Sequence, residues 1–119
     1  MALMKLFAIA VGLIHLVIMY LEMSGNTEVQ AKAFDMPSAF VKEKNAQTAL
    51  KNLGIYNGAL GLLIIISTLI FSGQALSMIL LLLMGFILVV GIFGGLTVTK
   101  KIYLIQVIPA LITIFIILF

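Results

Sequence analysis

Four long apolar runs separated by short polar connections dominate the pattern of hydrophobic and polar positions along the chain. The runs cover residues 2–23, 48–71, 76–97 and 102–119. Each approaches the ~20 apolar residues that a helix needs to cross the hydrocarbon core of a bilayer. Backbone polar groups in lipid must be satisfied within the segment, which favours helices. The pattern therefore predicts an all-α fold, an integral membrane four-helix bundle formed by residues 1–119 as a single domain.

The first connection, residues 24–47, is the one long polar segment, and it is mildly amphipathic. Pro37 prevents one continuous helix there, because proline cannot extend the hydrogen-bond ladder. We therefore expect two short helices, near 28–36 and 38–46, lying in the membrane interface. Such a segment can cap the mouth of a cavity, or it can simply pack against lipid headgroups.

Composition agrees with a membrane location. Of the 119 residues, 64% are hydrophobic and 9% are charged, and the mean hydropathy is +1.33. A soluble domain of this length cannot bury so much apolar surface. The chain contains no cysteine, which excludes disulfides, thiolate metal ligands and cysteine nucleophiles. The net charge of +3 comes from lysines that flank the apolar runs. We therefore expect the lipid bilayer, and no nucleic acid, as a partner.

The lysines also predict an orientation. Those near the first and third connections are Lys32, Lys42, Lys44, Lys51, Lys100 and Lys101, and both connections lie on the same side of the predicted bundle. The opposite side carries only Lys5. We expect the protein to lie in the cell membrane (the inner or plasma membrane). By the positive-inside rule, the two lysine-rich loops are cytoplasmic and both termini lie on the outer side.

Two ionisable side chains lie within the first apolar run: His15, the only histidine, and Glu22. Their seven-residue separation is nearly two helical turns, so both project from one face. Ionisable groups at mid-bilayer cost ~2.5 kcal/mol or more, and by default they mark a functional site. A plainer interpretation stays open, in which Glu22 reaches the interface and pairs with Lys51 while a neighbouring helix satisfies His15.

Further polar residues fall in the cytoplasmic half of the predicted bundle, whereas the outer half is almost purely apolar. Together with His15 and Glu22 they are the candidate ligand- or proton-binding residues: Asn52, Tyr56, Asn57 and Gln106. Polar groups that converge in a pocket usually orient a small molecule, so we expect a pocket open to the cytoplasm and closed outward. Two members have structural alternatives. Asn57 can hydrogen-bond to a neighbouring helix, and Tyr56 can belong to the interfacial aromatic belt.

Glycines at four-residue spacing occur twice, as Gly54 with Gly58 and as Gly91 with Gly95. Small residues at this spacing let helix backbones approach closely in lipid. The contact can lie within the bundle or between the subunits of a homodimer.

Pro109 interrupts the last apolar run. It leaves the carbonyl of Ile105 without its usual donor and predicts a kink whose polar groups are satisfied inside the bundle. We therefore expect Gln106 to face the bundle interior.

Segments 15–23, 52–58, 91–98 and 106–110 together resemble a known family of small bacterial membrane proteins of unknown function. They include the pair His15 and Glu22 and the Gln106-x-x-Pro109-Ala110 element, and the similarity covers almost the whole chain. The resemblance implies a four-helix architecture and names no activity.

Three functions are compatible with these features. We favour a small-solute or proton-linked transporter or binding protein, with His15 and Glu22 as its protonatable pair. The alternatives are a membrane-embedded enzyme acting on a lipophilic substrate, with either residue as general acid or base, and a structural or regulatory membrane subunit. The sequence has too few metal ligands, no nucleophile with an adjacent base and no glycine-rich phosphate loop, so we expect no metal and no cofactor.

Overall fold

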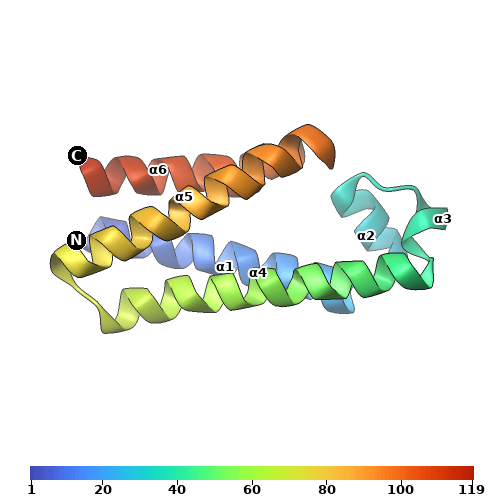
Figure 1. Ribbon diagram of the computed structural model, residues 1–119, viewed down its shortest axis with the longest axis horizontal. Helices are drawn as coiled ribbons and strands as arrows, with labels where there is room; N and C mark the ends of the chain where they lie inside the picture. The colour runs from blue at the N-terminus through green and yellow to red at the C-terminus, as the bar shows by residue number, and fades with distance from the viewer.

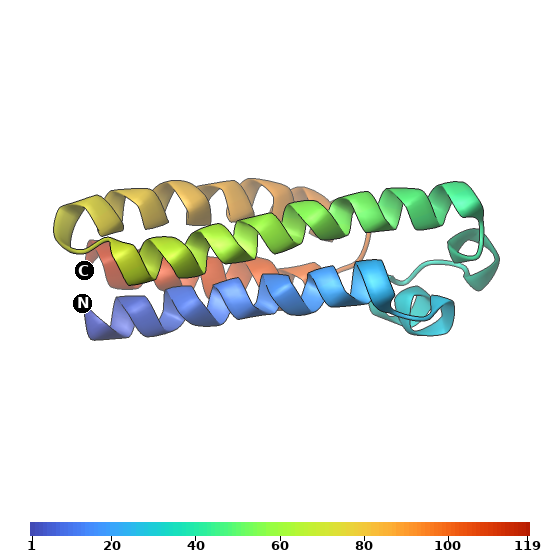
Figure 2. The same ribbon diagram turned by 90° about the horizontal axis from the view of Figure 1, so that it is seen from below.

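The computed structural model describes residues 1–119 as helices with no strand. In chain order these are α1 (Ala2–Ser24), α2 (Thr27–Phe34), α3 (Ser38–Val41), α4 (Lys44–Ile70), α5 (Gly73–Thr97), the π-helix η1 (Tyr103–Val107) and α6 (Ile108–Leu118). The long helices run roughly along the longest axis, which measures 48 Å (Figure 1). Both termini and the α4–α5 turn lie at one end, the terminal end, and α2 and α3 lie at the other, the loop end (Figure 2). The predicted all-α class is confirmed.

Three of the helices, α1, α4 and α5, are long and apolar enough to cross a membrane, whereas the apolar helix Tyr103–Leu118 is shorter. The chain therefore has the build of a membrane protein. The starts of α4 and α5, at Lys44 and Gly73, precede the expected starts at residues 48 and 76. The difference arises because hydropathy marks the apolar part of a helix, while the hydrogen-bond ladder continues into the polar residues beside it.

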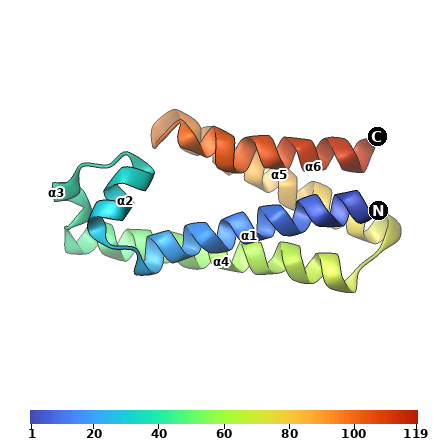
Figure 3. The same ribbon diagram turned by 180° about the vertical axis from the view of Figure 1, so that it is seen from behind.

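Glycines of α4 pack this helix closely along α1, its neighbour over most of its length (Figure 3). A Cβ atom on Gly61 would lie 2.6 Å from the carbonyl oxygen of Gly12 and 3.2 Å from Cβ of His15. A Cβ atom on Gly58 would collide with the side chain of Met19. Larger residues at these positions would separate the two backbones, which is the effect expected of small residues at helix interfaces in lipid.

The second glycine pair lies on α5 and faces η1. A Cβ atom on Gly91 would lie 3.0 Å from Cγ2 of Val107, and one on Gly95 would overlap the ring of Tyr103. Helices of the same chain thus fill both predicted glycine stripes. Neither stripe is exposed to a second copy of the chain.

The hydrophobic core brings together α1, α4, α5 and α6. Its buried members are Met4, Ala8, Val11, Ile64, Leu76, Leu80, Met84, Ile87 and Ala110. α1 contacts both α4 and α6, and α6 contacts α5. From their shared turn at the terminal end, α5 diverges from α4 toward the loop end (Figure 1), and the bundle opens between these two helices.

The last apolar helix begins with a π-helical turn. The N–H of Ile108, at the end of η1, donates to the carbonyl of Tyr103, five residues earlier. Pro109 follows directly and has no N–H to offer, so the ordinary ladder is interrupted where the sequence predicted a kink. The irregular turn contains Gln106. Single π-turns inside helices occur frequently at functional sites.

The long connection folds back over the loop end. Asn26 caps α2 by accepting a 2.8 Å hydrogen bond from the N–H of Val29, as N-cap residues do. α2 corresponds to the first expected short helix. The second, expected near 38–46, does not form as one unit, because α3 is a single turn and the chain enters α4 at Lys44.

Candidate functional site

Glu22 is a buried carboxylate with a neutral partner. It lies near the end of α1, and only 6% of its surface is exposed. Its Oε2 accepts a hydrogen bond of 2.8 Å from Nδ2 of Asn57 on α4, whereas its Oε1 accepts none within the chain. The ion pairs of the protein involve other acids, Lys42 with Glu28 and Lys101 with Asp35. Glu22 therefore has no cationic partner, and Lys51 does not pair with it.

A small cavity of about 130 Å³ adjoins Glu22. Its walls come from the loop-end parts of α1 and α4, from the end of α2 and from the segment between α5 and the last helix, and nine of its twelve lining residues are hydrophobic. Phe34 and Met36 line it at the end of α2, and Thr99 and Gln106 line it from the segment that follows α5. The space beside the carboxylate is thus largely apolar.

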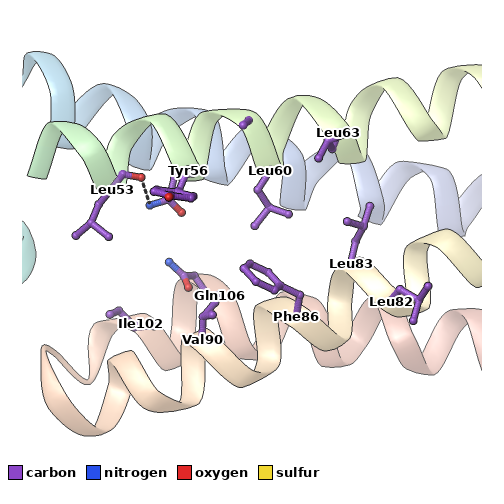
Figure 4. A pocket seen from close by; sticks show the side chains of 12 residues that line it. Leu53, Tyr56, Leu60, Leu63, Leu82, Leu83, Phe86, Val90, Ile102 and Gln106 are labelled. Atoms are coloured by element: carbon purple, nitrogen blue, oxygen red, sulfur yellow. Dashed lines mark hydrogen bonds between the residues drawn. The ribbon is translucent and has the colours of Figure 1, made fainter. Parts of the chain in front are cut away.

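A larger groove of about 650 Å³ opens between α4 and the α5–η1 segment (Figure 4). Leu60 on one wall faces Phe86 on the other, and ten of the twelve lining residues are hydrophobic. The two polar exceptions are Asn57 and Gln106. In Figure 4 the amide of Gln106 points across the groove toward Tyr56, so the polar groups gather at one end of a long apolar space.

The groove and the cavity are neighbours. Leu53, Ile102 and Gln106 line both of them. Glu22 lines the cavity, and Asn57, its hydrogen-bond partner, lines the groove. The two adjoining hollows, one beside the acid and one almost wholly apolar, are here called the Glu22 site.

His15 lies outside this site. Its side chain is 1% exposed, its Nδ1 lies 2.9 Å from the carbonyl oxygen of Val11, and its Nε2 has no hydrogen-bond partner. Neither hollow includes it. A Cβ atom on Gly61 would lie 3.2 Å from Cβ of His15, so α4 packs directly against this part of α1. Neither of these two hollows therefore holds both side chains of the expected pair.

Of the other predicted site residues, three line the groove and one lines neither hollow. Gln106, Asn57 and Tyr56 line the groove, although Tyr56 is 70% exposed and stands at its rim. Asn52 is exposed and lines neither hollow. It lies a short way along α4 from Asn57, but on a face of the helix that points away from α1.

A buried glutamine that the sequence did not single out holds α2 over the site. Gln30 is fully buried, and its Nε2 donates to the carbonyls of Leu21 and Glu22 at 3.0 and 3.1 Å. Gln47 in turn donates to Oε1 of Gln30 at 2.8 Å. These bonds use the free carbonyls at the end of α1, a requirement of every helix terminus. That requirement is the one signal that could have drawn attention to a polar residue shortly after α1.

A second contact fixes α2 to the far side of the cavity. The hydroxyl of Thr99 donates to Asp35, and Nζ of Lys101 donates to Oδ1 of Asp35 at 2.9 Å and to the carbonyl of Lys32 at 2.7 Å. The hydrogen bond from Thr99, followed by that from Lys101, lowers the pKa of the Asp35 carboxyl. We call Asp35, Thr99 and Lys101 the α2 latch. Asp35 is more than sixty residues from Thr99 and Lys101 in the chain, so local sequence patterns did not indicate this contact.

Fold and site define a class: a small all-helical protein with three helices apolar enough to cross a membrane and a buried acid that has no cationic partner. The chain belongs to the DUF1304 family, described as protein of unknown function, whose profile matches residues 9–118. It is similar to the uncharacterised protein YpaA of Lactococcus lactis, with 37% identity over 102 residues, or 85% of this chain and 84% of that protein. No solved structure matches the chain. The expected membership of a family of unknown function is confirmed.

Proposed function

We propose that this protein is a small-molecule-binding membrane protein of the transporter class, in which Glu22 holds either a proton or the head of a solute. The observation that carries the proposal is a nine-tenths-buried carboxylate with one unbonded oxygen, no cationic partner and a cavity beside it. An isolated charge in an apolar environment is costly. The Glu22 carboxyl therefore holds a proton when the site is empty. When it gives up that proton, its negative charge is neutralised by the solute that it binds.

Exchange at one oxygen links the two events. When Oε1 of Glu22 gives up its proton to bind a solute, the direction of the proton gradient decides the direction of solute movement. Asn57 and Gln106 suit both states, because a side-chain amide offers donors as well as an acceptor. The role that we assign to Glu22 does not involve His15, which differs from the pair that the sequence suggested.

The proposal also includes a membrane arrangement. We place α1, α4, α5 and the last helix across the bilayer as a four-helix bundle, with the loop end in the cytoplasm and both termini outside. It is supported by the concentration of lysines at the loop end and by the positive-inside rule. In this arrangement α2 covers the cytoplasmic side of the Glu22 site.

A structural role is the second candidate, and one observation favours it. The hydrogen bond between Glu22 and Asn57 joins α1 to α4, so the acid also ties two helices together. In that case Glu22→Gln has no effect beyond a small change in stability, because a glutamine can still accept the hydrogen bond from Asn57.

Proteoliposomes that contain a pH-sensitive dye distinguish the two. Small amines and quaternary ammonium ions are added outside, and proton movement is recorded for the wild type, Glu22→Gln and Glu28→Gln. Glu28 is a matched control, because it is an acid on the exposed surface of α2. We expect flux in the wild type and the control and none in Glu22→Gln. Flux that survives Glu22→Gln, or no flux with any of these ions, contradicts the transporter proposal.

Infrared spectroscopy adds a direct reading of the acid. We expect a protonated-carboxyl band that is absent from Glu22→Gln and that weakens when a cation is added to the wild type. If the intensity of this band does not change with any added ion, Glu22 has the structural role.

A further inference from the structure

We propose that the ligand of the Glu22 site is a lipophilic cation: an apolar body that lies in the groove between α4 and α5, with a positive head held at Glu22. This inference rests on the proposed function and adds the chemical class of the solute and its route of entry. Four observations carry it: the sign of the charge, the lining, the size of the two hollows and their exposure.

The sign of the charge comes from the residues around the head position. Glu22 is the only ionisable residue among those that line either hollow, apart from the phenol of Tyr56, and no lysine lines them. A carboxylate that lacks a cation in an apolar cavity attracts a positive head and repels a phosphate or carboxylate head. Anionic phospholipids and fatty acids are therefore poor ligands for the site.

The lining and the volume describe the rest of the molecule. The groove measures about 650 Å³, within the range of ~300–1,000 Å³ typical of small-molecule sites. Phe86 and Leu60 face each other across its middle (Figure 4), and only Asn57 and Gln106 interrupt the apolar lining. An apolar body with a single polar end matches this distribution, whereas a sugar or amino acid would leave most of its polar groups unpaired.

The exposure of the walls gives the route of entry. Leu63, Leu82 and Phe86 are 55%, 76% and 55% exposed on the side where α4 and α5 diverge, in the helices that are apolar enough to span a membrane. The loop-end side of the cavity is covered by α2 and closed by the α2 latch. A lipophilic molecule therefore enters sideways from the bilayer, where it is already concentrated.

Two probes of almost the same shape and opposite charge test the sign. Tetraphenylphosphonium and tetraphenylborate are measured by equilibrium dialysis against the purified full chain in detergent, with protein-free micelles as the background. We expect the cation to bind at least tenfold more tightly than the anion. Glu22→Gln should lower the cation's affinity at least tenfold, and Glu28→Gln should leave it unchanged.

Neighbouring leucines of α4 test the location. Leu63 lines the groove, whereas Leu62 is similarly exposed, at 50%, but does not line it. We expect Leu63→Trp to weaken binding of the cation at least fivefold by filling the groove, and Leu62→Trp to leave binding unchanged. Both side chains are on the surface of the chain, so neither variant endangers folding, and circular dichroism with gel filtration verifies this.

Each contrary result has a definite meaning. Equal binding of both probes, or binding of neither above the micelle background, overturns the lipophilic cation. If Leu63→Trp has no effect while Glu22→Gln does, the acid binds cations but the groove does not receive them. If the wild type is a dimer and Leu63→Trp is a monomer, a second copy occupies the groove and the inference is wrong. In all three cases a cation-sensitive infrared band from Glu22 would leave the proposed function standing.

Discussion

Asn57 on α4 donates to Glu22 on α1 over 2.8 Å, so a single hydrogen bond both joins two helices and provides the only protein partner of a buried carboxylate. The two consequences are separable. The tie between helices contributes to the free energy of unfolding, whereas the unbonded Oε1 determines what the site can hold. Variants that retain the hydrogen bond but remove the charge therefore distinguish stability from function.

A double-mutant cycle measures the strength of this tie. Asn57→Leu and Glu22→Leu, alone and together, should show a coupling of ~0.6 kcal/mol, the average for side-chain hydrogen bonds between membrane helices, and at most ~1.7 kcal/mol. Reversible unfolding in bicelles provides the four free energies. Asn52→Leu is the control on the same helix, because Asn52 is exposed and has no side-chain hydrogen bond to α1. Equal coupling of Asn52 and Asn57 to Glu22 would show that the effect is not specific to the contact.

Replacing one glycine with alanine should disrupt the packing of α1 on α4. At Gly61 the new Cβ atom would meet a backbone oxygen, that of Gly12, at 2.6 Å, and backbone cannot rotate away. We expect Gly61→Ala to lower the thermal unfolding midpoint in detergent clearly, with a cost of ~1–3 kcal/mol typical of overpacking. At Gly85 a Cβ atom would meet nothing within 4 Å, so Gly85→Ala should leave the midpoint unchanged or raise it slightly. Similar losses at both sites would contradict the observed helix packing.

The α2 latch should weaken in acid. Hydrogen bonds from Thr99 and Lys101 lower the pKa of Asp35 in the folded protein below its ordinary value of 3.8. A group whose pKa is lower in the folded state adds stability above its unfolded pKa, and this stability is lost as the pH falls through the folded pKa. The difference in unfolding midpoint between the wild type and Asp35→Asn should thus be constant near neutral pH and shrink only below about pH 4. The effect is small, because Lys101 and Asp35 are both half exposed.

A control separates the latch from general acid unfolding. Glu28 is an exposed acid of the same helix whose nearest lysine, Lys42, lies at 4.0 Å. The wild type and Glu28→Gln should keep nearly the same midpoint over the whole range of pH. A pH-independent difference between the wild type and Asp35→Asn would mean that the carboxylate does not supply the charge-dependent part of the latch.

Hydropathy was enough to predict the all-α class, and glycine spacing predicted a closely packed face on α4 but not that α1 is the helix that packs there. A hydrogen bond from Asn57 to a neighbouring helix was one of the two alternatives that the sequence left open, and Asn57 does donate such a bond to Glu22 on α1. These features depend on the position of a residue along its helix and on the direction of its side chain around the helix axis. Both follow from the residue number, because an α-helix has a fixed number of residues per turn. The distance between two helices is not encoded in that way. The pattern could therefore not predict that His15 is packed against α4 while Glu22 faces a cavity.

Contacts between segments that are distant in the chain could not be predicted from the sequence either, because they too depend on how the helices are placed relative to one another. Gln30, Thr99 and Lys101 are ordinary polar residues in loops or short helices, and their partners are known only when the chain has folded. The groove is also invisible in the sequence, because it results from the divergence of α4 and α5 rather than from any residue in them. For η1, Pro109 predicted an interruption of the helix, but it did not predict that the interruption takes the form of a π-helical turn.

His15 offers the sharpest remaining test, because it is an ionisable residue that the structure places in the core. Its Nε2 is buried without a partner, and a buried unsatisfied polar group costs ~1–3 kcal/mol. We expect His15→Leu, which removes that atom and keeps most of the volume, to leave the unfolding midpoint in detergent unchanged or to raise it. His15→Ala, by contrast, should lower the midpoint, because it leaves a cavity between α1 and α4. If His15→Leu is as harmful as His15→Ala, the imidazole makes a polar interaction that packing alone does not replace, and its exclusion from the function would have to be reversed.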